Sequence, residues 1–319
     1  MKYIVKFLCV FMVLSITGCA SIQYDLPYKC QNIESDFIDS SEKAIPFAYS
    51  SCITDNDVLD VTGIDMNEIG AAGLFDLSKK EVLYAKNPHT QLDPASLTKV
   101  MTAIVALKYS SLDTIITVDE PIVFNEVGAT SINLKVGDKL TLDQALHILL
   151  LRSANDVAIA IAREIGGSEE AFCELMNKEA LSLGATNTHF LNSHGLTTDN
   201  HYTCIYDMYL IFQEAINYSK FNDIIQLDSY TTKIIDVNAI EKEINCTNSN
   251  RFIASDELIL PDNISVLGGK TGTTNRAGHC LIIHSKDTQN NSYISVILNA
   301  PNRDMIYSKM IELLSLIGI

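Results

Sequence analysis

At residues 93–101 the sequence reads Asp93-Pro94-Ala95-Ser96-Leu97-Thr98-Lys99-Val100-Met101. Apolar residues recur from here with the spacing of a helix that buries one face, at Leu97, Val100, Met101, Ile104 and Leu107. The pattern predicts Asp93 as the N-cap and Pro94 as the first helical residue. Ser96 and Lys99 lie three residues apart, so we expect them on one helix face, within hydrogen-bonding reach.

Predicted strands lie on both sides of this helix in the sequence. An apolar run at 70–77, the turn Ser78-Lys79-Lys80 and residues 81–85 are typical of a β-hairpin. Further helices are predicted at 142–151, 157–165 and 171–183, then, after a variable polar stretch, strands at 265–269, 278–285 and 293–298 and a closing helix at 304–317. This order predicts an α+β fold, in which one antiparallel sheet from both chain ends packs against a helical region.

The N-terminus has the features of an export signal. Lys2 and Lys6 precede an apolar run at 7–16 that is too short to span a bilayer. The run ends in Ile16-Thr17-Gly18-Cys19, which resembles a bacterial lipoprotein box, so we expect a lipid on Cys19. The alternative is an ordinary exported protein with a chance cysteine there. We therefore divide the chain into a signal segment (1–19), a polar tether (20–66) and a folded domain (67–319).

The composition excludes some classes of function. The 319 residues are 47% hydrophobic and carry a net charge of −16, with a pI near 4.7, which argues against binding to nucleic acid or to an anionic membrane surface. The sequence shows no Cys or His spacing typical of zinc sites, and we expect no metal and no cofactor. Six cysteines follow Cys19, and their pairing stays open.

Three short motifs follow one another in the chain: Ser96-Leu97-Thr98-Lys99, Ser153-Ala154-Asn155 and Lys270-Thr271-Gly272. A serine hydroxyl needs a base to act as a nucleophile, and a lysine serves only when burial or a nearby cation lowers its pKa. Apolar neighbours surround Lys99 in the sequence, and Lys270 is a candidate for the second cation. We predict Ser96 as the nucleophile and Lys99 as its base.

The other motif residues are candidates for substrate binding. Backbone N–H groups of Ser96 and Thr273 are expected to form an oxyanion hole, with Gly272 allowing close approach of the chain. We expect Lys270, with the hydroxyls of Thr271 and Thr273, to hold a carboxylate. Ser153 is predicted to relay a proton and Asn155 to orient a peptide. Helix caps and a glycine-rich hairpin are the structural alternatives, and we interpret the histidines, including His194 and His279, as surface or structural residues.

With these residues, the sequence from about Ile69 onward resembles the D-alanyl-D-alanine carboxypeptidase family, the low-molecular-mass penicillin-binding serine peptidases. The likeness also includes residues 92–102, Ser193-His194-Gly195-Leu196 and residues 268–274. It implies a β-lactamase/transpeptidase-like fold and acylation of Ser96 by a peptidoglycan stem peptide ending in D-Ala-D-Ala. It also implies release of D-alanine, hydrolysis of the acyl-enzyme and covalent inhibition by β-lactams. Residues 67–319 would be the catalytic domain, held at the outer face of a bacterial membrane by the lipid on Cys19.

The sequence departs from this family in two respects. Many members carry a second, β-rich domain and an amphipathic anchor, and we expect neither here. Members of the family often have an arginine after the last strand that binds the substrate carboxylate. Ile306 occupies the matching place here and Arg303 lies nearby, so the role stays unassigned.

Two alternatives to the carboxypeptidase remain. A β-lactamase needs an additional base, for which Glu174 is the candidate, but it is predicted to lie inside the helix at 171–183. A non-catalytic β-lactam sensor or peptidoglycan-binding lipoprotein is disfavoured by the intact Ser96, Lys99, Ser153 and Lys270.

Overall fold

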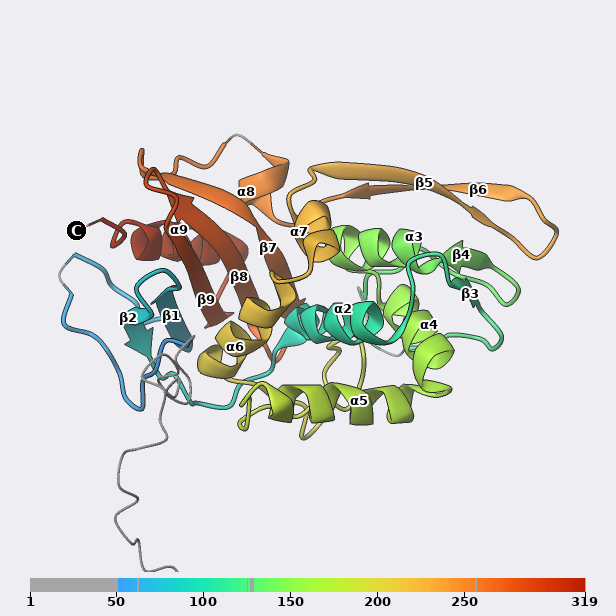
Figure 1. Cartoon of the computed structure of the whole chain (residues 1–319), viewed down its shortest axis with the longest axis horizontal. Coiled ribbons are helices and arrows are strands. Elements are labelled where there is room, and N and C mark those ends of the chain that lie inside the picture. Colours follow the sequence, from blue (N-terminus) through green and yellow to red (C-terminus); the bar gives the residue numbers. More distant parts are fainter. Residues whose placement is uncertain (1–50, 62, 125, 127–128, 256, 319) are drawn as a thin grey trace, which may run out of the picture. The chain divides into compact units, whose positions relative to one another are not determined.

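A computed structural model describes residues 51–61, 63–124, 126, 129–255 and 257–318. The predicted signal segment, Cys19 and Cys30 lie outside these residues. Helices and strands carry the labels of Figure 1. No helix among the described residues has both the length and the apolar character to cross a membrane.

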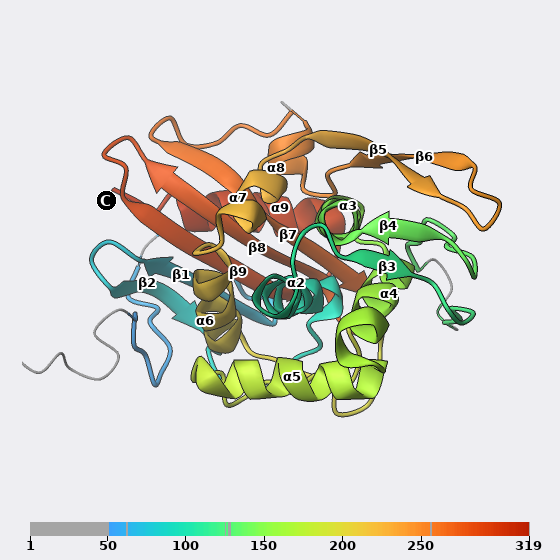
Figure 2. The same cartoon turned by 45° about the vertical axis from the view of Figure 1, so that its right-hand side comes forward.

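The main sheet has five antiparallel strands in the order β2 (Glu81–Lys86), β1 (Ala71–Asp76), β9 (Ser292–Ala300), β8 (Gly278–Asp287) and β7 (Ile264–Thr274). Helix α9 (Arg303–Leu314) covers one face, while α6 (Ile205–Ala215) and α2 (Thr98–Tyr109) lie over the other (Figures 1 and 2). Along β8, Leu281 and Ile283 pack toward α9, and Cys280 and Ile282 pack toward the helical layer. Because both faces are covered, the inner strands β1, β8 and β9 contain long apolar runs, and the predicted sheet from both chain ends is confirmed.

Helix α2 runs through the middle of the helical region. Every residue from Thr98 to Ala106 is buried, whereas the sequence pattern predicted a single buried face. The surrounding helices are α3 (Leu142–His147), α4 (Asn155–Gly166), α5 (Glu169–Ser182) and α7 (Ser219–Ile225), together with α6. Short α8 (Arg251–Ala254) leads into β7. A helix enclosed on all sides is held rigidly, and the residues at its N-terminal end are held with it.

The structure also contains a sheet that the sequence analysis did not predict. A second, four-stranded antiparallel sheet contains β3 (Ile115–Thr117), β4 (Lys139–Thr141), β5 (Ser229–Ile235) and β6 (Glu241–Thr247), and the β5–β6 ribbon extends past α3 (Figure 1). Only Ile234, Ile244 and Cys246 of this ribbon are buried. Its strands are rich in Thr, Lys and Glu, so the apolar alternation that indicates a strand is weak.

The folded region also begins earlier than the predicted boundary at residue 67. Cys52 is fully buried; its backbone N–H donates to Tyr209 Oη (2.8 Å), and Tyr206 Oη donates to its carbonyl (3.0 Å). Val58 pairs with Ala85 of β2. The described part of the predicted tether therefore packs against the domain. All five described cysteines are buried and unpaired: Cys52, Cys173, Cys204, Cys246 and Cys280.

Candidate active site

Ser96 is the middle residue of a single 3-10 turn, η1 (Ala95–Leu97), which leads directly into α2. The helix begins later than predicted, and Asp93 is not its N-cap. The Asp93 carboxylate instead accepts two hydrogen bonds from Arg276 (Nε at 2.8 Å and Nη2 at 2.6 Å). Ala95 has a positive φ of 47°, which turns the chain sharply just before Ser96. The side chain of Ser96 stays partly exposed because of this turn.

Lys99 lies directly beneath Ser96 and is completely buried. Its Nζ lies 3.0 Å from Ser96 Oγ and donates to Asn155 Oδ1 (2.7 Å) and to the His194 carbonyl oxygen (2.5 Å). Burial and then the charge of Lys270 lower the pKa of Lys99 well below its usual value of 10.5, against a smaller opposing effect of Asp156. Ser96 and Lys99 thus lie within hydrogen-bonding reach, as their spacing predicted, and the Lys99 pKa is shifted in the direction that a lysine base requires.

A second buried lysine, Lys270, projects from β7 on the other side of the site. Its Nζ donates to Ser153 Oγ (2.9 Å) and to the Thr271 carbonyl (2.9 Å), and burial lowers its pKa to about 7. Ser153 follows a π-helical turn, η2 (Ile148–Arg152), and has a left-handed φ of 63°. Such a conformation in a non-glycine residue is strained, and functional sites often contain it. The turn directs Ser153 toward Lys270.

Strand β7 is the edge strand of the main sheet and passes close to Ser96. A Cβ at Gly272 would lie 2.9 Å from the Ser96 backbone nitrogen and 3.0 Å from Ala95 Cβ, so only glycine allows this approach. Backbone N–H groups on the outer side of an edge strand have no partner in the sheet. This position of β7 is compatible with the predicted oxyanion hole, in which the backbone N–H groups of Ser96 and Thr273 would donate to one oxygen atom.

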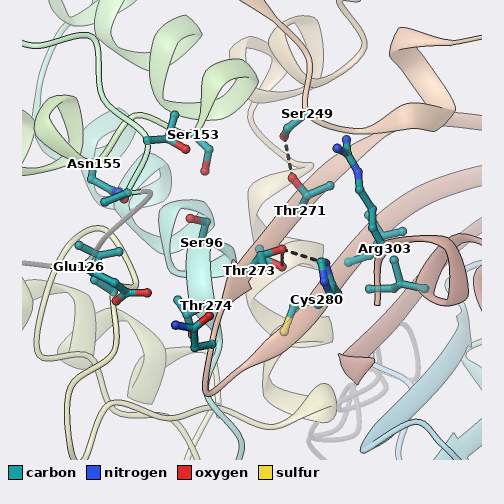
Figure 3. Close-up of a pocket in the computed structure, with 18 of the residues that line it drawn as sticks. Ser96, Glu126, Ser153, Asn155, Ser249, Thr271, Thr273, Thr274, Cys280 and Arg303 are labelled. Carbon is teal, nitrogen blue, oxygen red and sulfur yellow. Dashed lines mark hydrogen bonds between the residues drawn. The ribbon is translucent and has the colours of Figure 1, made fainter. Parts of the chain in front are cut away.

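These residues surround a cleft of about 460 Å³. Figure 3 shows Ser96 near its centre, with Ser153 and Asn155 on one side and Thr271 and Thr273 on the other. The structure therefore brings together every predicted site residue except Cys19, which lies outside the described residues. Glu174 lies within α5, as predicted, and does not line the cleft.

The loop at 193–196 supports Lys99, a role that the sequence analysis missed. His194 is buried rather than at the surface, and burial lowers the pKa of its imidazole to about 3, so the side chain is neutral. Its backbone carbonyl oxygen accepts the hydrogen bond from Lys99 Nζ. Gly195 has a φ of +87°, and a Cβ there would lie 1.9 Å from the Ala95 carbonyl oxygen. The motif Ser193-His194-Gly195-Leu196 was the available signal, but the sequence pattern did not show that a backbone atom was the functional group.

The rim of the cleft contains further polar residues to which the sequence analysis gave no role in the site. Ser249 and Thr271 share a hydrogen bond between their hydroxyls (2.6 Å), and Arg303 extends beside them (Figure 3). His279, interpreted as a surface or structural residue, lines the cleft and contacts Thr273 Oγ1 at 3.2 Å. Glu126 lies on the opposite side. No cluster of three His, Cys, Asp or Glu side chains suited to a metal occurs among the described residues.

Comparison with known proteins places these features in a family. The chain is 32% identical to D-alanyl-D-alanine carboxypeptidase DacF of Bacillus subtilis over 258 residues, 77% of this chain and 62% of that protein. It is 32% identical to D-alanyl-D-alanine carboxypeptidase DacC of Escherichia coli over 253 residues, 76% of this chain and 59% of that protein. The match thus spans about three fifths of the length of these relatives.

Solved structures show the same fold. The crystal structure of the Streptomyces K15 DD-transpeptidase superposes with a TM-score of 0.69 at 24% identity, over 78% of this chain and 96% of that one. The family model described as D-alanyl-D-alanine carboxypeptidase, peptidase family S11, matches residues 63–302, which include all three motifs. The chain belongs to the D-alanyl-D-alanine carboxypeptidase family of serine peptidases.

Proposed function

We propose that this protein is a serine D-Ala-D-Ala carboxypeptidase that removes the terminal D-alanine from peptidoglycan stem peptides through an acyl-enzyme on Ser96. One observation carries the proposal: Lys99 Nζ lies 3.0 Å from Ser96 Oγ in a fully buried position that lowers the lysine pKa. A neutral amine at that distance is a base for the hydroxyl, and Ser96 itself faces the cleft.

Acylation begins when Ser96 Oγ attacks the carbonyl carbon of the scissile bond and passes its proton to Lys99 Nζ. The carbonyl oxygen becomes an oxyanion held by the Ser96 and Thr273 N–H groups. When the C–N bond breaks, the leaving amine takes a proton from Ser153 Oγ, which takes one from Lys270 Nζ, 2.9 Å away. D-alanine leaves, and the peptide remains as an ester on Ser96.

Hydrolysis reverses the proton movements. Water attacks the ester carbonyl and gives its proton to neutral Lys270 through Ser153. Ser96 Oγ then leaves and recovers a proton from Lys99. Both lysines return to their starting states, so the cycle needs no cofactor.

The substrate carboxylate fits the side of the cleft formed by β7. Lys270, Thr271 and Thr273 supply one cation and two hydroxyl groups there, and Asn155 supplies an amide for the peptide. Arg303, left without a role at the outset, extends beside Thr271 (Figure 3), and we include it as a second cation for the carboxylate. The same groups would hold the carboxylate of a β-lactam while Ser96 is acylated.

The test is to incubate the protein with a peptide ending in D-Ala-D-Ala and to measure free D-alanine, and separately to follow a β-lactam. We expect D-alanine release that disappears in Ser96→Ala, with a β-lactam bound covalently and hydrolysed slowly. Rapid β-lactam hydrolysis would identify a β-lactamase. Acylation without release of D-alanine would identify a sensor, and either result would overturn the proposal.

We also propose that the protein is exported and held at the outer face of a bacterial membrane by a lipid on Cys19, with residues 20–50 as a tether to the catalytic domain. The apolar run at 7–16 and the sequence around Cys19 support this. Metabolic labelling with a radioactive fatty acid tests it: the protein should be labelled, and Cys19→Ser should not. Equal labelling of both would refute attachment at Cys19.

A further inference from the structure

Among the described residues, three charged side chains line the cleft, Glu126, Arg152 and Arg303, and Nη1 of Arg152 donates to the Asn245 carbonyl (3.0 Å). Arg303 lies on the Thr271 side of Ser96, and Glu126 lies on the Asn155 side (Figure 3). Among the described residues that line the cleft, Glu126 is the only carboxylate. Its Oε2 accepts a hydrogen bond from the Thr197 backbone N–H (3.1 Å), which holds the side chain against the loop that follows Gly195. A half-buried carboxylate is thus fixed at the cleft wall.

The polarity of the cleft has a direct consequence for a bound peptide. If the C-terminal carboxylate lies by Thr271 and Arg303 and the scissile carbonyl lies at Ser96, the acyl part of the peptide continues past Asn155 toward Glu126. A D-alanine side chain at the scissile bond is only a methyl group. The residue before it therefore has the first side chain long enough to reach the wall of the cleft.

We infer that Glu126 is a specificity-determining residue that selects peptides with a cationic side chain immediately before D-Ala-D-Ala. This inference rests on the proposed function, because the direction of the peptide follows from where its carboxylate binds. The surroundings of Glu126 agree with it: Ala129, Thr130, Leu196 and Thr274 line the same cleft, and the printed hydrogen bond of the carboxylate comes from the neutral Thr197 N–H rather than from a cation. A substrate ammonium group supplies the missing charge.

The experiment compares two peptides that differ only in one ammonium group, with lysine or norleucine before D-Ala-D-Ala. We expect the full chain to favour the lysine peptide by about fivefold in kcat/KM, the size of a partly exposed ion pair, and the preference to fall at high salt. In Glu126→Gln the ratio should fall to about one. Glutamine keeps an oxygen for the Thr197 N–H, so a purely structural role of Glu126 would leave the ratio unchanged.

Glu120→Gln is the matched control, because it removes the same charge from an exposed position in the same segment outside the cleft. It should keep the wild-type ratio. In Glu126→Lys the preference should reverse toward a peptide with glutamate in place of lysine. The inference is overturned if the wild-type protein has a lysine-to-norleucine ratio of kcat/KM near one, or if Glu126→Gln keeps the wild-type ratio. In either case, release of D-alanine still supports the proposed function. Failure of the wild-type protein to release D-alanine from either peptide overturns both.

Discussion

Among individual residues, the proposed chemistry depends on two lysines that the structure buries on opposite sides of Ser96. Lys99 acts as a base only when neutral, whereas Lys270 attracts a carboxylate only when charged. Burial lowers the pKa of both, which favours the first role and limits the second. The two requirements oppose each other as the pH changes.

The dependence of kcat/KM on pH should therefore be bell-shaped. The rising limb reflects loss of the Lys99 proton and should fall below pH 10.5, the usual lysine pKa. The falling limb reflects loss of the Lys270 proton in the free enzyme and should begin near pH 7, where burial places its pKa. D-alanine release measured from about pH 5 to about pH 10 gives both limbs. In Lys270→Arg the falling limb should disappear, since a guanidinium keeps its proton, and the rate should be lower throughout, because the guanidinium cannot pass a proton to Ser153. A falling limb that persists in this variant would refute the assignment.

The sequence could predict this pair of lysines but not all of their surroundings. Ser96 and Lys99 are neighbours through local helical geometry, which a single helical turn determines. Lys99 and the His194 carbonyl are 95 residues apart in the chain, and a backbone oxygen has no residue type to reveal it. For the same reason Asp93 was misassigned: its spacing suited a helix cap, but its partner Arg276 lies 183 residues away.

At the scale of elements, the turn at 193–196 positions the start of α2. Gly195 packs against the Ala95 carbonyl, directly before Ser96. A methyl group at Gly195 would strain a positive φ and would also push Ala95 away. A change in the turn at 193–196 should therefore also displace Ser96.

This link predicts different results for two glycine substitutions. Gly167→Ala has a positive φ of 75° but nothing within 4 Å of the new Cβ, so it should destabilise the protein by about 1 kcal/mol and leave acylation unchanged. Gly195→Ala should destabilise it more and also slow acylation of Ser96 by about tenfold or more, because a displacement near 1 Å at the reacting atoms has effects of that size. Urea unfolding and β-lactam acylation rates provide the two measurements. Equal acylation rates in both variants would contradict the link.

Helices and strands were predicted correctly where the burial of their side chains produces a regular apolar pattern in the sequence. Strands β8 and β9 are enclosed on both faces and appeared as apolar runs, and α4 and α5 appeared as helical runs, whereas only residues 265–269 of the edge strand β7 were predicted as a strand. The β5–β6 ribbon and α6 belong to a segment that was interpreted only as variable and polar. The ribbon buries few side chains. Helix α6 buries Tyr209, Ile211 and Phe212, but its polar neighbours in the sequence obscured it.

For the whole molecule, the packing of residues 51–61 has a consequence for stability. Cys52 fits beneath β1, and its backbone bonds to Tyr206 and Tyr209 join the N-terminal segment to α6. A chain that starts at residue 67 loses this segment and exposes Phe75 and Tyr209, which stack against each other. We expect its free energy of unfolding to be about 2–3 kcal/mol lower than that of a chain that starts at residue 51. Its urea midpoint should be lower as well. Equal midpoints would show that the segment adds no stability.

Burial of Lys270 should also make the stability of the whole domain depend on pH. Its pKa is about 7 in the folded state and 10.5 when unperturbed, so the unfolded chain binds the extra proton between these values. The free energy of unfolding should therefore rise as the pH increases from about 7 to about 10.5, by up to 1.4 kcal/mol per pH unit for this group.

Lys270→Met tests this at the level of the whole molecule, because methionine matches the length of the lysine chain but takes no proton. Urea unfolding at about pH 7 and about pH 9.5 should show a slope with pH that is smaller in this variant than in the wild-type protein, with Lys99 supplying what remains. Lys79→Met, at an exposed lysine in the β1–β2 turn, should keep the wild-type slope. An unchanged slope in Lys270→Met would mean that Lys270 binds its proton equally in both states. The expected result means that the protein holds this cation at the cleft at a cost in stability, as expected of a group that the proposed mechanism uses to bind the carboxylate and to give a proton to Ser153.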